Sequence, residues 1–158
     1  MANLRIELEV SYVAMEDRSQ VRRRPGRPPD LFRGGARADL AVFDLERRPI
    51  YAIEIKRAWD WYSAWQDGLR LCTLLDRCGR GRGGSVRAGF FGLFNHRSSH
   101  ARHAPNLLEV RCHKIIEELE AWDFSIGYTA GPWKSERSKD GERAFQALCF
   151  SFSDQGRV

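Results

Sequence analysis

Apolar and polar residues alternate in two neighbouring segments of the chain, ADLAVFDL at 38–45 and IYAIEIK at 50–56. A period of two with many β-branched and aromatic residues is typical of strands. A short polar turn at 46–49 separates the two segments, so we predict a β-hairpin. With Arg47-Arg48 as a two-residue loop, residues are expected to pair across the hairpin when their numbers sum to 95.

Other segments repeat apolar residues at different spacings. Apolar residues recur at helical spacing in 60–76 and again in 106–122, so we predict a helix in each. Apolar runs at 88–94 and 144–152 predict strands, and the first of these is expected to be a buried parallel strand. The segment 3–15 fits both patterns, because its apolar residues also alternate. We predict an amphipathic helix there and keep a strand as the alternative.

This order of elements predicts an α/β fold with a mixed central sheet flanked by helices. The 158 residues fit a single domain, 1–158, and 42% hydrophobic residues can fill one core. No segment is as long and apolar as a membrane span, and the start of the chain lacks the apolar core of a signal peptide. We therefore expect a cytoplasmic protein with no membrane partner and with its four cysteines reduced.

Positive charge is concentrated in two loops. The chain carries 26 Lys+Arg against 21 Asp+Glu, a formal net charge of +5. Seven arginines and one carboxylate lie within 18–37, in a run broken by Pro and Gly, and four more arginines lie among glycines at 77–87. Such loops suit contacts with the phosphates of a nucleic acid, although they would also serve as a solvated surface. The arginines predicted to bind nucleic acid are Arg22, Arg23, Arg24, Arg27, Arg37, Arg80 and Arg82.

The predicted hairpin gathers charged side chains on one face. Because side chains alternate along a strand, Asp39, Ala41, Glu54 and Lys56 share a face, with Asp39 opposite Lys56 in the predicted register. The other face is purely apolar, and we expect it to pack on the core. Two carboxylates with a backbone carbonyl and waters suit Mg²⁺, with Mn²⁺ as the alternative. An ordinary salt-bridged strand pair would contain the same residues.

Asp39 on one strand and Glu54-Ile55-Lys56 on the next resemble the active-site motif of the PD-(D/E)xK superfamily, the restriction-endonuclease-like nucleases. The resemblance covers about residues 3 to 94. It implies a restriction-endonuclease-like core in which one helix precedes the hairpin and another follows it. The residue before Asp39 is Ala38, where the family often has proline.

The resemblance also implies a function, metal-dependent hydrolysis of phosphodiester bonds in DNA. Asp39, Glu54 and the backbone carbonyl of Ile55 would bind Mg²⁺, and Lys56 would stabilise charge or orient the attacking water. Family members often add a glutamate from the first helix to the metal site, a role that would fall to Glu9 in preference to Glu7.

Several points stay open at this stage. Gln66, on the helix after the motif, resembles a glutamine that some branches of the family place near the active site. A catalytically inactive module that binds nucleic acid or a protein partner is the alternative function, because one fold hosts many functions. The form of the substrate, the biological setting in defence, repair or recombination, and assembly as a homodimer or in a larger complex are not decided by the sequence.

Overall fold

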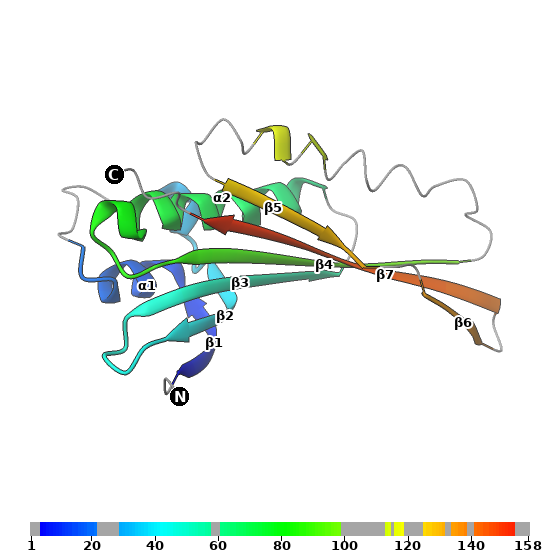
Figure 1. Cartoon of the computed structure of the whole chain (residues 1–158), viewed down its shortest axis with the longest axis horizontal. Coiled ribbons are helices and arrows are strands. Elements are labelled where there is room, and N and C mark those ends of the chain that lie inside the picture. The colour runs from blue at the N-terminus through cyan, green and yellow to red at the C-terminus, as the bar shows by residue number, and fades with distance from the viewer. Residues whose placement is uncertain are drawn as a thin grey trace.

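The computed structural model joins the N-terminal two thirds of the chain to three later strands in one sheet (Figure 1). The residues that the structure describes are 4–21, 29–57, 61–98, 113–114, 116–118, 125–131, 134–138 and 141–153. The elements in chain order are β1 (Arg5–Ser11), α1 (Tyr12–Arg18), the 3-10 turn η1 (Asp30–Phe32), β2 (Arg37–Phe43), β3 (Pro49–Arg57), α2 (Trp61–Cys78), the 3-10 turn η2 (Arg80–Arg82), β4 (Ala88–Ser98), β5 (Ser125–Ala130), β6 (Lys134–Ser138) and β7 (Gly141–Ser153).

The sheet is mixed and has seven strands, in the order β1-β2-β3-β4-β7-β5, with β6 paired to the start of β7. Strands β3 and β4 run parallel, and the other pairs are antiparallel. A parallel pair needs a crossover connection, which α2 provides here. The α/β class and the mixed sheet are therefore confirmed. No helix among the described residues is long and apolar enough to cross a membrane.

Most of the predicted elements are present. The helix predicted at 60–76 is α2, and the strands predicted at 88–94 and 144–152 are parts of β4 and β7. Of the helix predicted at 106–122, the structure describes five residues as helical, and the rest lies outside the described residues. Strands β5 and β6 were not predicted.

The predicted helix at 3–15 is wrong for its first half. Residues 5–11 form the edge strand β1, as their alternating apolar residues indicate, and the helix α1 begins at Tyr12. Ser11 marks the change, because its side chain accepts a hydrogen bond from the backbone N–H of Ala14 at 3.0 Å. Such an N-cap satisfies a backbone donor of the first turn that has no partner within the helix.

The hairpin of β2 and β3 has a different register from the predicted one. Leu40 pairs with Ile53 and Ala41 with Ala52, so the paired numbers sum to 93. The two-residue loop is also wrong, because Asp44 closes a longer turn by accepting the backbone N–H of Arg48 at 2.9 Å. A shift of two residues leaves every side chain on its predicted face, because side chains alternate with a period of two.

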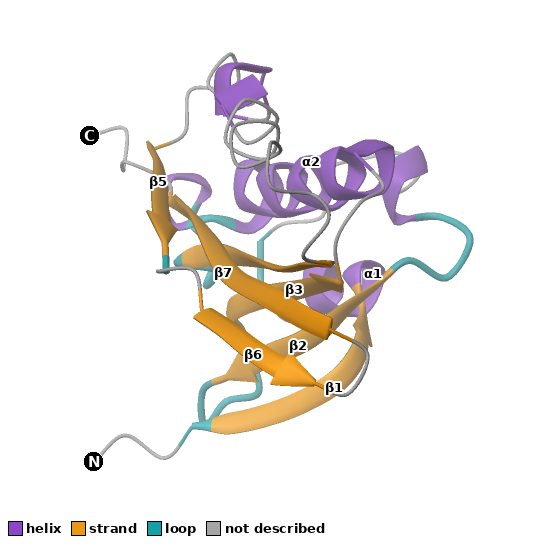
Figure 2. Ribbon diagram, turned by 90° about the vertical axis from the view of Figure 1, so that its right-hand side faces the viewer, coloured by secondary structure: helices purple, strands orange, loops and turns teal. Residues whose placement is uncertain are grey.

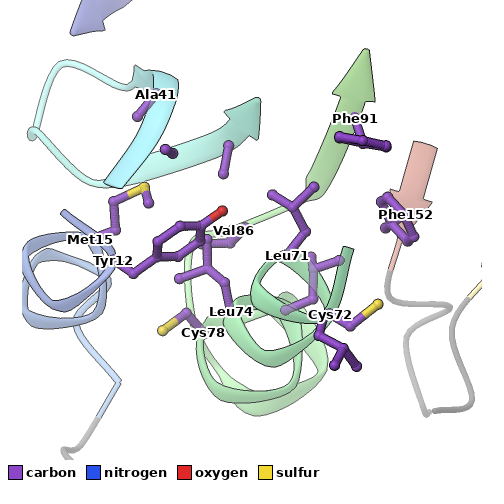
Figure 3. Packing of buried hydrophobic residues seen from close by; sticks show 14 of the residues in the cluster. Tyr12, Met15, Ala41, Leu71, Cys72, Leu74, Cys78, Val86, Phe91 and Phe152 are labelled. Carbon is purple, nitrogen blue, oxygen red and sulfur yellow. The ribbon is translucent and has the colours of Figure 1, made fainter. Parts of the chain in front are cut away.

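The helices cover one face of the sheet (Figure 2). Tyr12 and Met15 of α1 are fully buried and meet Leu71 and Leu74 of α2 in the core (Figure 3). Small residues on this face let the helices approach: a Cβ on Gly89 of β4 would lie 3.1 Å from the Cβ of Leu71. The fully buried alanines of this region are Ala38, Ala41 and Ala52.

The hairpin turns its mixed face, not its apolar face, toward this core. Ala41 and Glu54 are buried, whereas Ile55 of the apolar face is 53% exposed. The predicted orientation of the hairpin is therefore wrong. The apolar residues on the opposite face, which no helix of the described residues covers, are Leu40, Val42, Ile53 and Ile55.

Candidate active site

Glu54 lies at the centre of a polar cluster under the helices. It stands on β3 and is only 2% exposed. The hydroxyl of Tyr12, the first residue of α1, donates a hydrogen bond of 2.6 Å to Glu54 Oε1. The ring of Tyr12 is held by stacking on Phe32 of η1, with ring centroids 5.0 Å apart. A buried carboxylate thus receives one strong donor from the helix that precedes the hairpin.

Asp39 is joined to the same strand by a backbone contact. The N–H of Ile55 donates a hydrogen bond of 2.6 Å to Asp39 Oδ2. The last paired residues of β2 and β3 are Leu40 and Ile53, so Asp39 and Glu54 are the next residues along the two strands. The predicted register put Asp39 opposite Lys56 instead. The structure therefore brings Asp39 and Glu54 together. Ile55, whose backbone carbonyl is the third predicted metal ligand, is the residue that binds Asp39 through its N–H. Neither Glu54 Oε2 nor Asp39 Oδ1 accepts a hydrogen bond from the described residues.

Lys56 is held by a carboxylate that the sequence analysis did not identify. Its Nζ lies 3.1 Å from Oδ2 of Asp67 on α2, and Asp67 is 1% exposed. Arg70 binds the other oxygen of Asp67 at 2.5 Å and donates from Nε to the carbonyl of Leu31 at 3.2 Å. Asp67 Oδ2 accepts no hydrogen bond within the described part of the chain, so its contact with Lys56 is an ion pair only.

The environment makes Glu54 hard to ionise. Burial raises the pKa of Glu54 from the ordinary 4.5 to about 7, and the nearby charges of Asp67 and Asp39 also raise it. The hydrogen bond from Tyr12 and the charge of Lys56 act in the opposite direction. The pKa of Tyr12 is raised well above its ordinary 10.0, first by burial and then by Glu54, so Tyr12 stays a donor.

The oxygen atoms of Asp39 and Glu54 are the donors available to the Mg²⁺ ion that the motif implies. Mg²⁺ in proteins is usually bound by one or two carboxylates, and waters and substrate phosphates complete its six ligands. Asp39 and Glu54 each keep one oxygen free of hydrogen bonds from described residues, and a cation would relieve the charge repulsion that raises the pKa of Glu54. Within the described ranges, no group of three or more His, Cys, Asp or Glu side chains could hold a metal. Asp39 and Glu54 thus offer two oxygens, a small number of protein ligands such as Mg²⁺ takes when waters and a phosphate complete its shell.

The predicted accessory residues do not contact this cluster. Glu9 lies on β1 between two residues that pair with Leu40 and Ala38, so its backbone is near Asp39, but its side chain is exposed and its φ is +51°. Glu7 binds Arg18 at 3.0 Å instead. Gln66 is half-buried on α2, where its neighbour Asp67 makes the contact with Lys56. The proposed roles of Glu9 and Gln66 stay predictions.

The predicted nucleic-acid-binding arginines fall into different surroundings. Arg37 is exposed at the start of β2, two residues before Asp39, and Arg80 is exposed on η2. Arg82 is paired with Asp76 of α2 at 2.8 Å. The arginines that lie outside the described residues are Arg22, Arg23, Arg24 and Arg27.

Sequence reasoning missed Tyr12 and Asp67. Asp67 had a signal, because it lies three residues after buried Ala64 and four before buried Leu71, within the apolar stripe of a helix. A buried carboxylate at such a position must be paired with a cation. Tyr12 had a weaker signal, since its partner Glu54 is 42 residues away.

Comparisons of the chain with protein-family models, curated proteins and solved structures give no match.

Proposed function

We propose that this domain is a metal-dependent nuclease of the PD-(D/E)xK type that hydrolyses phosphodiester bonds of DNA. The observation that carries the proposal is the cluster itself: Asp39 and Glu54 lie together on the hairpin, and Lys56 stands beside them on the same strand face. A buried acid with its pKa near 7, next to a lysine, is typical of a functional site.

The arrangement of elements supports a restriction-endonuclease-like core. The helix α1 precedes the hairpin and α2 follows it, as the resemblance implies. The crossover through α2 leads into β4, which runs parallel to β3. Glu54 and Lys56 are therefore on a strand in the middle of the sheet, and their backbone pairs in register with Phe91 and Leu93 of β4.

The carboxylates and Lys56 would divide the chemistry between them. Asp39, Glu54 and the carbonyl of Ile55 would hold Mg²⁺, which supplies charge neutralisation at the phosphate and lowers the pKa of a water. Lys56 keeps 40% of its side chain exposed, so its ammonium can reach a phosphate oxygen and stabilise the charge that develops in the transition state.

Asp67 and Arg70 would keep Lys56 in position. Asp67 is anchored by Arg70, which is itself bound to the carbonyl of Leu31 outside the helix. A lysine side chain has many rotamers in solution, and an anionic partner limits them. Exposed Arg37, near Asp39 on β2, is positioned to contact the DNA backbone.

The proposal is tested by cleavage of circular and linear DNA, single- and double-stranded, with Mg²⁺, Mn²⁺ or EDTA. We expect cleavage by the wild-type chain in the presence of either metal and none in EDTA. Lys56→Ala and Glu54→Gln should each reduce the rate by about 10²-fold or more, the size of effect seen when a group that stabilises transition-state charge is removed. Asp76→Asn, on the exposed side of α2, is the matched control and should leave the rate unchanged.

Two results would contradict the proposal. One is cleavage that persists in EDTA, and the other is equal activity of wild type, Lys56→Ala and Glu54→Gln. If all three proteins fold, bind DNA and fail to cut it with either metal, the inactive binding module replaces the nuclease.

A further inference from the structure

A polar cavity of about 210 Å³ lies at the opposite end of β3 from the carboxylate cluster. Ile50, at the start of β3, lines it, and Glu54 follows four residues later, a separation of roughly 13 Å at about 3.3 Å per residue of strand. The cavity walls come from the hairpin turn, the end of α1 and the loop between α2 and β4. Its chemistry is therefore separate from that of Glu54.

Positive charge dominates this cavity. Arg48, Arg80 and Arg87 line it together with Asp44, so three guanidinium groups and one carboxylate give a local charge of +2. Arg48 is already committed, because it binds Asp44 at 2.7 Å and Glu46 at 3.0 Å. Arg80 and Arg87 have no ion pair or side-chain hydrogen bond among the described residues. Two guanidinium groups at one small cavity, each lacking a counter-charge, favour an anion between them.

Two helix ends turn the backbone at the cavity. Gln20, which follows the C-cap of α1, has a φ of +63°, and Gly83, the C-cap of η2, has a φ of +76°, and both line the cavity. Gly84 cannot be replaced by a larger residue, because a Cβ there would lie 2.0 Å from the carbonyl oxygen of Cys78. Left-handed residues commonly end helices, so the backbone at these two ends forms a fixed wall of the cavity.

We infer that this cavity is a binding site for a phosphate group, held by Arg80 and Arg87 and separate from the candidate active site. A phosphate monoester carries close to two negative charges at neutral pH, which matches the local charge of +2. A volume of about 210 Å³ equals that of about seven liquid waters at ~30 Å³ each, enough for one phosphate and part of its hydration shell. Arginine binds phosphate oxygens in bidentate geometry. The inference holds whether or not Glu54 takes part in cleavage.

The test is a titration with inorganic phosphate at constant ionic strength, with chloride as the reference anion. Binding is followed by NMR, through the chemical shifts of the backbone amides of Gly83 and Gly84. The wild-type chain should show saturable shifts with phosphate and none beyond the ionic-strength effect with chloride. Arg80→Ala together with Arg87→Ala should weaken phosphate binding by about tenfold or more, since it removes two charge-assisted contacts. Arg5→Ala, whose side chain is paired with Glu7 on the edge strand β1, is the matched control and should bind phosphate as the wild type does.

A second arm identifies the source of the phosphate. A short duplex DNA with and without a 5′-phosphate is titrated in EDTA, so that no cleavage occurs. One outcome is that the double variant binds the duplex more weakly as well as inorganic phosphate, with the slope of log K against log salt concentration reduced by about one to two. In that case the site holds a phosphate of a nucleic acid. If it weakens only inorganic phosphate, the site holds a free phosphate compound. Equal responses to phosphate and chloride, or equal phosphate affinity of the wild type and the folded double variant, would overturn the inference.

Discussion

The two faces of the sheet differ in what covers them. The face under α1 and α2 buries large apolar side chains such as Phe91 and Phe150, with small residues and the carboxylate of Glu54 among them. The other face carries an apolar row in which Leu8 pairs with Leu40, Leu40 with Ile53, and Ile53 with Phe90. Leu8 at the edge of that row is 70% exposed. Small residues such as Gly89 let the helices approach the covered face. The buried carboxylate there is held by the hydrogen bond from Tyr12.

The largest expected difference between the faces is in packing energy. Leu74 on α2 is 1% exposed, and Leu74→Ala should lower the free energy of unfolding by about 2–5 kcal/mol, because it removes buried methyl groups and leaves a cavity. The same substitution at Leu8, Leu8→Ala, should change it by about 0.5 kcal/mol or less. Urea denaturation of both variants measures the difference. Similar losses at the two sites would mean that the open face is covered in solution.

The second prediction concerns the pH dependence that Glu54 gives to the covered face. With its folded pKa at about 7 against 4.5, Glu54 keeps its proton in the folded protein over a pH range in which the unfolded chain has lost it. The stability from this group is complete below pH 4.5 and is lost as the pH rises to about 7, a loss on the order of 3 kcal/mol. Glu54→Gln should abolish this loss in urea denaturation at a series of pH values.

The control for this titration is Glu46→Gln in the exposed hairpin turn. Its stability should follow the pH dependence of the wild type, since Glu46 lies in water. If the wild type and Glu54→Gln show the same change in stability between pH 4.5 and 7, then Glu54 ionises at its ordinary pKa in the folded protein and the covered face is hydrated at this position.

A smaller effect is expected for the carboxylate that holds Lys56. Asp67→Asn should lower the free energy of unfolding by about 1–3 kcal/mol, because it leaves half-buried Arg70 without the buried carboxylate that it binds. Asp76→Asn on the same helix removes a surface pair with Arg82 and should cost about 0–1 kcal/mol. Thermal unfolding of the two variants side by side compares them. Equal losses would show that Asp67 contributes no more than a surface charge.

The last comparison changes reactivity without changing stability. Cys149 is exposed and pairs in register with Gly92 on the open side of β4, whereas Cys72 and Cys78 are buried under the helices. Burial raises the pKa of Cys72 to about 12 and that of Cys78 to about 11, which suppresses the reactive thiolate. Alkylation of the folded protein, mapped by peptide mass, should modify Cys149 before Cys72 and Cys78. Labelling of Cys72 at a comparable rate would contradict the assignment of the two faces.

Much of the fold could be predicted, because its signals are local. Alternation predicted β2 and β3, and helical spacing predicted α2, which begins at residue 61 against the expected 60. The register could not be predicted, since it depends on the turn closed by Asp44 and Arg48 at a distance of 2.7 Å. The orientation of the hairpin failed for a different reason: the apolar content of a face says little about whether helices can approach it.

The candidate site was predicted in part. Asp39, Glu54 and Lys56 stayed on one face because the register error was two residues, an even number. Tyr12 and Asp67 come from elements distant in sequence, and their contacts depend on how α1 and α2 pack. Contacts of this kind are fixed by tertiary structure and leave little trace in local patterns.

Calorimetric titration with Mg²⁺ at pH 7 tests most directly whether Asp39 and Glu54 together bind a divalent cation, as we propose. Measured in two buffers of different ionisation enthalpy, binding should release about half a proton, because Glu54 has a pKa of about 7 and must ionise to bind the ion. Glu54→Gln and Asp39→Asn should each abolish the binding. Mg²⁺ binding that releases no proton and persists in both variants, or no binding by the wild type, would contradict the claim.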